Sequence, residues 1–327
     1  MSPIAPSSVR VPVVAAALLA LALAPATRAA APDPQKVSNK TVYAIAVDSD
    51  NKLVTDLRKD EWAIREDGTD RAIVDLKPAT DPIDVVLLID TSKTAFASIV
   101  DLRAGLQAFA KTLFAGPAPV TISISDVSGS SVMIAKDQKS ADEVDKILGK
   151  TVPDQTQQTV ILEAVSEVSK KLAKSPTPRR AIVVVNMDGV PEGSTLDSPT
   201  AIRAIVASGA SLWVVTYENN DTKSMSVTPG AGSAAIATGQ AQGGIGQGNR
   251  GGSRDIVLTR VPVATGGLRA QLSAPSALTD ALTAMASALI GQYAVTYARP
   301  DGPMPKGVQM GDMRPGVKVI YPSTPIK

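Results

Sequence analysis

The 327-residue chain carries 33 basic and 31 acidic residues and contains neither histidine nor cysteine. These two absences exclude histidine bases, thiolate nucleophiles, disulfides and the usual zinc ligands, so any bound metal must be held by oxygen atoms. Hydrophobic residues make up 44% of the chain and aromatic residues only 3%, which predicts an aliphatic core in one large domain or two unequal ones.

Residues 1–29 have the features of an export signal. Arg10 precedes an apolar run at residues 11–24, and Thr27 and Ala29 occupy the two small-residue positions of a cleavage site. The apolar run is shorter than the roughly 20 residues that a membrane span needs, although an uncleaved anchor is the alternative. We therefore expect a periplasmic or secreted mature chain without a membrane span.

Removing this signal also changes the charge of the chain. Arg10 and Arg28 are lost with it, which leaves 31 basic residues against 31 acidic ones. A neutral chain without a cluster of lysine and arginine is not expected to bind nucleic acid.

Residues 37–80 are predicted to form a small β-rich unit, because short alternating stretches are separated by turn residues. The acidic run at residues 48–51 is similar to the start of a calcium-binding loop. An EF-hand would require glycine and glutamate where Leu53 and Lys59 stand, so a turn between strands is the better interpretation.

From residue 83 to about residue 300, apolar strands alternate with amphipathic helices. The stretches "IDVVLLID", "RAIVVVNMD" and "SLWVVTY" are typical of strands buried on both faces, and "YAVTYARP" is predicted to be the final strand. Such alternation predicts an α/β fold in which helices cover both faces of a mostly parallel, doubly wound sheet. Residues 301–327 are expected to form a C-terminal tail.

A glycine-rich stretch at residues 228–254 is predicted to be a flexible insertion. It contains the dinucleotide-binding pattern G-x-G-x-x-G at residues 246–251, but no strand precedes it and no helix is expected to follow it. We therefore interpret the pattern as fortuitous and expect the insertion to flank the binding face.

Five oxygen-bearing side chains are predicted to meet at one edge of the sheet: Asp90, Ser92, Thr94, Thr159 and Asp188. In doubly wound sheets, ligands bind beyond the carboxyl ends of the strands. Two carboxylates and three hydroxyls suit a hard cation, Mg²⁺ or Mn²⁺. With only two negative charges, this set would leave a coordination position for a carboxylate of another molecule.

Each of these residues also has a purely structural interpretation. Ser92 and Thr94 could cap the following helix, Thr159 could be an N-cap, and Asp188 with Gly189 could form an ordinary turn. Their placement at corresponding strand ends favours the metal site over the separate explanations.

The segments "VVLLIDTSKT", "QTVILEAV" and "AIVVVNMDG" resemble the metal-ion-dependent adhesion site (MIDAS) of von Willebrand factor type A (VWFA) domains. That family has a D-x-S-x-S motif, to which Asp90, Ser92 and Thr94 correspond, followed by a separate Thr (Thr159) and a separate Asp (Asp188). The β-rich leader and the "TGG" at residues 265–267 are similar to exported bacterial VWFA-related proteins. The resemblance covers residues 40–300.

This resemblance implies a Rossmann-like VWFA domain at residues 83–300 that binds an acidic group of a partner protein through Mg²⁺ or Mn²⁺. Three positions depart from the family pattern: Thr94 replaces a serine, Lys93 stands where a small residue is common, and Gln158 stands where a glycine often precedes the threonine.

We therefore expect a binding module for cell adhesion or protein binding and not an enzyme. One alternative is a metal-free scaffold for protein–protein interaction. Another is a phosphatase-like hydrolase with Asp90 as nucleophile, but its D-x-D-x-[TV] motif would need a second aspartate where Ser92 stands. The chain also has no phosphate-binding G-x-x-x-x-G-K-[ST] loop and no G-x-S-x-G elbow.

Overall fold

The largest sheet has seven strands in the order β10-β11-β9-β8-β5-β6-β7. The computed structural model describes residues 36–218, 236–237, 251–312 and 314–323. The strands are β5 (Ile83–Ile89), β6 (Val120–Asp126), β7 (Val132–Gln138), β8 (Arg179–Asp188), β9 (Ser211–Glu218), β10 (Ile236–Ala237) and β11 (Arg269–Leu272). All neighbours from β11 to β6 pair in parallel, whereas β7 and β10 pair antiparallel at the two edges.

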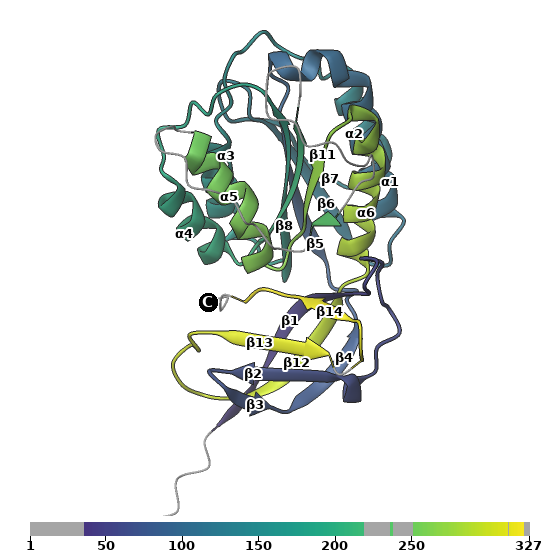
Figure 1. Cartoon of the computed structure of the whole chain (residues 1–327), viewed down its shortest axis with the longest axis vertical. Coiled ribbons are helices and arrows are strands. Elements are labelled where there is room, and N and C mark those ends of the chain that lie inside the picture. Colours follow the sequence, from purple (N-terminus) through teal and green to yellow (C-terminus); the bar gives the residue numbers. More distant parts are fainter. Residues whose placement is uncertain (1–35, 219–235, 238–250, 313, 324–327) are drawn as a thin grey trace, which may run out of the picture. The chain divides into compact units, whose positions relative to one another are not determined.

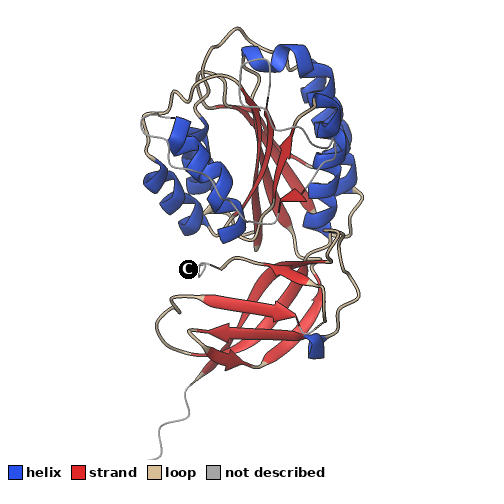
Figure 2. Cartoon of the chain, in the orientation of Figure 1, coloured by secondary structure: helices blue, strands red, loops and turns tan. Residues whose placement is uncertain are grey.

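Helices cover both faces of this sheet (Figures 1 and 2). One face carries α1 (Ile99–Phe114), α2 (Ala141–Lys150) and α6 (Leu278–Ile290), and the other carries α3 (Ile161–Leu172), α4 (Ser198–Ser208) and α5 (Gly251–Ala264). Short 3-10 helices occur at Lys59–Glu61 (η1), Lys93–Ser98 (η2) and Pro275–Ala277 (η4). This arrangement confirms the α/β fold with a mostly parallel, doubly wound sheet. Among the residues that the structure describes, no helix is long and apolar enough to cross a membrane.

The alternation of side chains along β5 explains the two cores. Val85, Leu87 and Ile89 belong to the core beneath α1, α2 and α6. Val86 and Leu88 belong to the core beneath α3, α4 and α5. Because successive side chains of a strand point to opposite faces, a continuous apolar run is what a sheet covered on both sides requires.

Seven further strands form two antiparallel sheets, ordered β14-β1-β12-β4 and β13-β2-β3. They are β1 (Val37–Val47), β2 (Trp62–Glu66), β3 (Thr69–Arg71), β4 (Ile73–Pro78), β12 (Tyr293–Pro300), β13 (Val308–Asp312) and β14 (Lys318–Ile320). The β-rich part is therefore built from both ends of the described chain.

Two expectations from the sequence differ from this arrangement. The strand Tyr293–Pro300 was predicted to be the final strand of the part in which strands alternate with helices, but it pairs with β1 and β4. Residues 301–327 were expected to be a tail, but they contribute β13 and β14. The reason is that Tyr293, Val295 and Tyr297 share a core with Trp62 and its neighbours, which provides the partners for one face of β12.

Local turn signals in this part lie where the sequence places them. Residues 48–51 form a turn in which Asp48 Oδ1 accepts the amides of Asp50 and Lys52, each at 2.9 Å. Asp67 and Gly68, at φ 47° and 81°, connect β2 to β3. Two positive φ values in a two-residue loop match the twist of the flanking strands.

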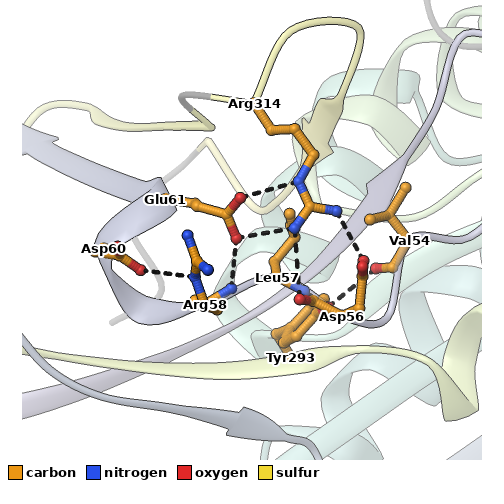
Figure 3. Close-up of polar contacts among 8 residues, drawn as sticks. All are labelled: Val54, Asp56, Leu57, Arg58, Asp60, Glu61, Tyr293 and Arg314. Atoms are coloured by element: carbon orange, nitrogen blue, oxygen red, sulfur yellow. Dashed lines mark hydrogen bonds and ion pairs between the residues drawn. The ribbon is translucent and has the colours of Figure 1, made fainter.

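The loop that precedes β2 is fastened by Arg314 (Figure 3). Its guanidinium contacts both carboxylate oxygens of Glu61, at 3.0 and 2.9 Å, and Asp56 Oδ1 at 2.8 Å. The Tyr293 hydroxyl joins the same loop, because it donates to Val54 O and accepts from the Leu57 amide. Residues far apart in the sequence thus hold one loop of the antiparallel part.

The predicted glycine-rich insertion at residues 228–254 is shorter than expected at its end. Residues 251–254 belong to the first turn of α5. Residues 228–235 and 238–250 lie outside the described residues, as do residues 1–29. After α5, Gly267 approaches the start of β9 so closely that an added Cβ would lie 1.9 Å from Leu212 O, which explains the glycine in "TGG".

Candidate functional site

The carboxyl ends of β5, β6 and β8 lie side by side at one edge of the large sheet. Each of these strands ends in, or is directly followed by, an aspartate: Asp90 after β5, Asp126 on β6 and Asp188 on β8. Parallel neighbours place these ends at the same edge, as the sequence predicted for Asp90 and Asp188.

Asp90 is fully buried and is held by backbone amides. Its Oδ1 accepts the Ser92 amide at 2.9 Å, and its Oδ2 accepts the Met187 amide at 3.0 Å. The side chain is 0% exposed. Burial raises the pKa of Asp90 to about 6, although hydrogen bonds from Ser92 and Met187 act in the opposite direction. Its neighbour Thr91 donates to Asp126 Oδ2 at 2.6 Å, which brings the second aspartate close.

The two hydroxyls that follow Asp90 lie together. Ser92 Oγ and Thr94 Oγ1 are 3.0 Å apart, and Thr94 Oγ1 donates to Met187 O at 2.5 Å. Ser92 takes the N-cap position of η2, but its side chain caps no amide there. The capping interpretation of Ser92 is therefore wrong. Both hydroxyls lie at the end of β5, and that of Thr94 contacts Met187, the residue before Asp188.

Thr159 lies deeper between two loops of the same edge. It forms isolated bridges with Ser128 and Glu192, and its hydroxyl lies 3.4 Å from Glu192 Oε2. The N-cap of α3 is Val160, so Thr159 does not cap that helix. Burial raises the pKa of Glu192, against which the hydrogen bond from Ser194 acts.

Asp188 has a cationic partner. Its Oδ1 lies 2.9 Å from Nη2 of Arg254, whose side chain is only 7% exposed. The Asp188 side chain is 23% exposed and thus reaches the surface of the edge. Gly189, at φ 139°, turns the chain directly afterwards, in a conformation that favours glycine.

The five predicted residues are therefore gathered at one edge but are not all in direct contact. Asp90 and Thr94 both contact Met187, next to Asp188, and Ser92 contacts Thr94. Thr159 and Asp188 instead direct their hydrogen bonds to Glu192 and Arg254.

Sequence reasoning did not select Asp126, Glu192 or Arg254. Asp126 ends a strand just as Asp188 does, so its position after "VTISIS" carried the same signal. Glu192 follows Asp188 by four residues in a loop without a motif. Arg254 is 66 residues from Asp188, and no local pattern announces their pairing.

Two of the three departures from the pattern, Lys93 and Gln158, lie in loops beside this edge of the sheet. Lys93 is exposed, and its backbone amide donates to Thr156 O of the neighbouring loop at 3.1 Å. Gln158 is exposed and lies against Gly193, where an added Cβ would be 2.7 Å from the Gln158 amide carbon. The Gln158 side chain thus takes space beside the loop that carries Glu192.

The chemistry of these donors fits a hard divalent cation such as Mg²⁺ or Mn²⁺. The buried Asp90 carboxylate has no cationic partner among the described residues, and the hydroxyls beside it are oxygen donors. In the described part of the chain, no group of three or more His, Cys, Asp or Glu side chains is arranged to hold a metal. A cation here would therefore depend on hydroxyls as much as on carboxylates.

No protein-family model and no curated protein matches the chain. The solved structures similar to it include proximal thread matrix protein 1 of the mussel byssus, with 12% identity, a TM-score of 0.47 and coverage of 69% of this chain and 51% of that one. A second structure of that protein has a zinc-occupied MIDAS motif. This chain thus spans about half the length of the mussel protein.

Two bacterial structures are also similar. A von Willebrand factor type A protein from Catenulispora acidiphila shows 8% identity and a TM-score of 0.46, covering 89% of this chain and 73% of that one. BatB from Bacteroides thetaiotaomicron shows 15% identity and a TM-score of 0.43, covering 63% of this chain and 98% of that one. Because all these TM-scores are below 0.5, the likenesses add no functional residue to those described above.

Proposed function

We propose that this chain is an exported protein-binding module that uses a divalent cation, Mg²⁺ or Mn²⁺, at the carboxyl edge of its sheet to engage an acidic group of a partner protein. The side chains proposed to hold the cation are Asp90, Ser92, Thr94, Thr159 and Asp188. Residues 1–29 are proposed to direct export.

The observation that carries this proposal is the state of Asp90. A carboxylate that is 0% exposed, with each oxygen accepting a backbone amide and no cationic partner among the described residues, is costly to bury as an anion. Its pKa of about 6 expresses that cost. A cation beside Ser92 and Thr94 would offset it, which explains why the chain keeps an acidic side chain at this position.

The surface next to these hydroxyls suits a protein partner. Phe96 on η2 and Val100 on α1 are 65% and 74% exposed, within a few residues of Thr94. A bound divalent cation would supply an open position for a carboxylate oxygen of the partner. The exposed apolar side chains would pack against the partner around that contact. Asp90 and Asp188 would balance the charge of the cation.

The test is thermal unfolding of the purified protein in EDTA, Mg²⁺, Mn²⁺ and Ca²⁺. A ligand that binds only the folded state at 100 times its Kd stabilises it by about 2.7 kcal/mol. We expect a higher Tm in Mg²⁺ or Mn²⁺ than in EDTA for the wild type and no such difference for Ser92→Ala. Identical wild-type melting in all four buffers would contradict the proposal.

The partner is sought separately, by capture from an extracytoplasmic fraction in Mg²⁺ and in EDTA. We expect a captured protein that EDTA releases, and that an excess of a free carboxylate such as acetate does not fully displace because apolar contacts also hold it. Capture that is unaffected by EDTA would contradict the role of the cation.

A metal-free scaffold is the second candidate, and the Arg254–Asp188 ion pair favours it. In this alternative, the guanidinium permanently neutralises Asp188, and partners bind through surface shape alone. The same melting experiment separates the two candidates, because only the first predicts a cation-dependent Tm.

We also propose that the chain is not an enzyme. A nucleophilic Asp90 would need an oxygen atom open to substrate, but the side chain is fully buried and both oxygens accept amides. Ser92 cannot serve as the general acid that a phosphatase of this type requires.

A further inference from the structure

Arg254 is a buried cation at an unfavourable position. It lies in the first turn of α5, and its residue is 6% exposed. The first turn of a helix carries a partial positive charge from the unpaired amides, so a cation there is disfavoured. Burial adds to the cost, because a charge removed from water needs a partner.

Asp188 supplies that partner. Arg254 Nη2 donates to Asp188 Oδ1 at 2.9 Å, and Nη1 donates to Val190 O at 3.1 Å. The contact with the exposed Asp255 is longer, at 3.7 Å, and Nε has no hydrogen-bond partner among the residues that the structure describes. The guanidinium is thus directed at the loop that begins with Asp188 and not at its own helix.

We propose that Arg254 is a built-in competitor of the divalent cation for Asp188, so that ion binding requires the Arg254–Asp188 pair to separate. This inference rests on the proposed function of the site. Without the ion, the guanidinium neutralises the more exposed of the two proposed carboxylate ligands, and the site is closed to a second positive charge.

The charges of Asp90, Asp188, Arg254 and the ion determine how strongly Arg254 weakens ion binding. Asp90 and Asp188 supply two negative charges, and the guanidinium cancels one of them before any ion arrives. If the guanidinium stayed about 5 Å from the bound ion, Coulomb's law for a double and a single positive charge, even with the dielectric constant of water, would give a repulsion that corresponds to roughly a tenfold loss of ion affinity. Removing the charge of Arg254 should therefore raise the affinity by at least that factor.

The pairing also makes the first turn of α5 sensitive to the ion. Arg254 is anchored to the loop at Asp188 and Val190, whereas the helix itself is held by Val257, Leu258 and Val261 in the core. Separation of the ion pair would release the N-terminal turn while the buried part of α5 keeps its packing. Ion binding would then change the face that surrounds Asp188.

The experiment measures Mn²⁺ affinity by isothermal titration calorimetry on the purified protein, four single variants and one double variant. Arg254→Gln and Arg254→Met both remove the charge. Both are used so that, if one of them folds poorly, the other still provides the affinity measurement. Arg254→Lys retains a positive charge. Arg203→Gln is the matched control, because Arg203 is an exposed arginine of α4 whose Nη2 bonds to Thr200 in its own helix.

We expect Arg254→Gln and Arg254→Met to bind Mn²⁺ at least about tenfold more tightly than the wild type. Arg254→Lys and Arg203→Gln should bind like the wild type. In EDTA, the two neutral variants should melt below the wild type, because they lose the ion pair, and Mn²⁺ should raise their Tm more than it raises that of the wild type. Adding Asp188→Asn to Arg254→Gln should remove the gain in affinity.

Equal Mn²⁺ affinity of the wild type and the neutral variants would overturn the inference and leave the proposed function standing. No Mn²⁺ binding by either the wild type or the neutral variants would overturn the proposed function itself. Tight binding by Arg254→Lys would also count against the inference, since the gain would then follow from lost packing and not from lost charge.

Discussion

At the scale of single residues, Asp90 and Asp188 differ in burial and in hydrogen-bond partners, although both lie at the ends of buried strands. Asp90 accepts two backbone amides in a fully buried position. Asp188 is partly exposed and paired with Arg254. The first carboxylate is held rigidly and lacks a cation among the described residues, whereas the second already has one. A divalent ion would supply the missing cation beside Asp90. At Asp188 it would compete with Arg254.

Thr94→Val tests the Thr94 hydroxyl at the carboxyl end of β5. The change removes the hydrogen bond to Met187 O and the contact with Ser92 Oγ, so we expect the free energy of unfolding in EDTA to fall by about 1 kcal/mol. The Tm increase caused by Mn²⁺ should disappear, because an oxygen donor is lost. Differential scanning calorimetry with and without Mn²⁺ measures both effects. Thr41→Val, an exposed threonine of β1, should leave the Mn²⁺ effect unchanged.

At the scale of elements, the pairing of β12 determines which segments of the chain form the antiparallel part. It pairs with β1 over eight residues and with β4 on its other side. The strand therefore follows α6 directly in the sequence but joins a sheet whose other members begin near residue 37. The antiparallel part cannot form until both ends of the described chain have been made.

Trp62→Ala tests the core of this antiparallel part. Trp62 is 4% exposed and packs edge-to-face on Tyr293, with ring centroids 5.3 Å apart. Truncating a buried tryptophan leaves a cavity, so we expect a loss of about 3–5 kcal/mol in the free energy of unfolding. Urea denaturation measures it. Phe96→Ala, at an exposed aromatic residue, should change stability by no more than about 0.5 kcal/mol, and an equal loss in both variants would refute the assignment.

A second element-scale prediction concerns pH. The Tyr297 hydroxyl donates to the buried Glu66 at 2.8 Å, and burial together with this carboxylate raises the pKa of Tyr297 above its usual value. The folded state therefore keeps its proton at a pH where the unfolded state loses it, which means that stability falls as pH rises above about 10. Urea denaturation at pH 8 and pH 11 should show this fall for the wild type and a smaller one for Tyr297→Phe. Tyr321→Phe is the control, and a fall as small as that of Tyr297→Phe would contradict the prediction.

At the scale of the whole molecule, the two sets of sheets share one core and one buried arginine. Ile45, Val47 and Ile320 from antiparallel strands belong to the same apolar cluster as Leu289 of α6. Arg179, at the start of β8, is 3% exposed.

Arg179 joins the segments that connect the two parts. Its guanidinium donates to Ala79 O at 3.1 Å, Asp81 O at 3.2 Å and Gln292 Oε1 at 2.9 Å, and it also bonds to Leu289 O. These acceptors flank the places where the chain enters and leaves the α/β part.

Arg179→Met should therefore destabilise the whole protein. The variant keeps apolar bulk but leaves several buried carbonyl groups without a donor, which costs roughly 3 kcal/mol or more. We also expect unfolding in urea to split into two transitions when followed by tryptophan fluorescence, because Trp62 and Trp213 report on different sheets. Arg203→Met should show one transition with near wild-type stability, and a single unchanged transition for Arg179→Met would refute this role.

The local patterns of the sequence predicted a large share of the fold. The apolar runs of β5, β8 and β9 are typical of buried parallel strands, and they lie next to one another in the large sheet. The strand β12 was assigned to the α/β part, but it belongs to an antiparallel sheet, because its pattern fits either sheet and only the register with β1 and β4 distinguishes them. The strands β13 and β14 were missed, since both are short and follow a stretch rich in proline and glycine.

By itself, the sequence determined the α/β architecture and the edge of the sheet at which Asp90, Ser92, Thr94 and Asp188 lie, because burial on both faces and the position of a strand end show in the pattern of consecutive residues. Only the tertiary structure decided that Asp188 is paired with Arg254, that Thr159 faces Glu192 and that the last strands complete the first ones. Each of these contacts joins residues that are far apart along the chain, and its formation depends on packing that no local pattern encodes.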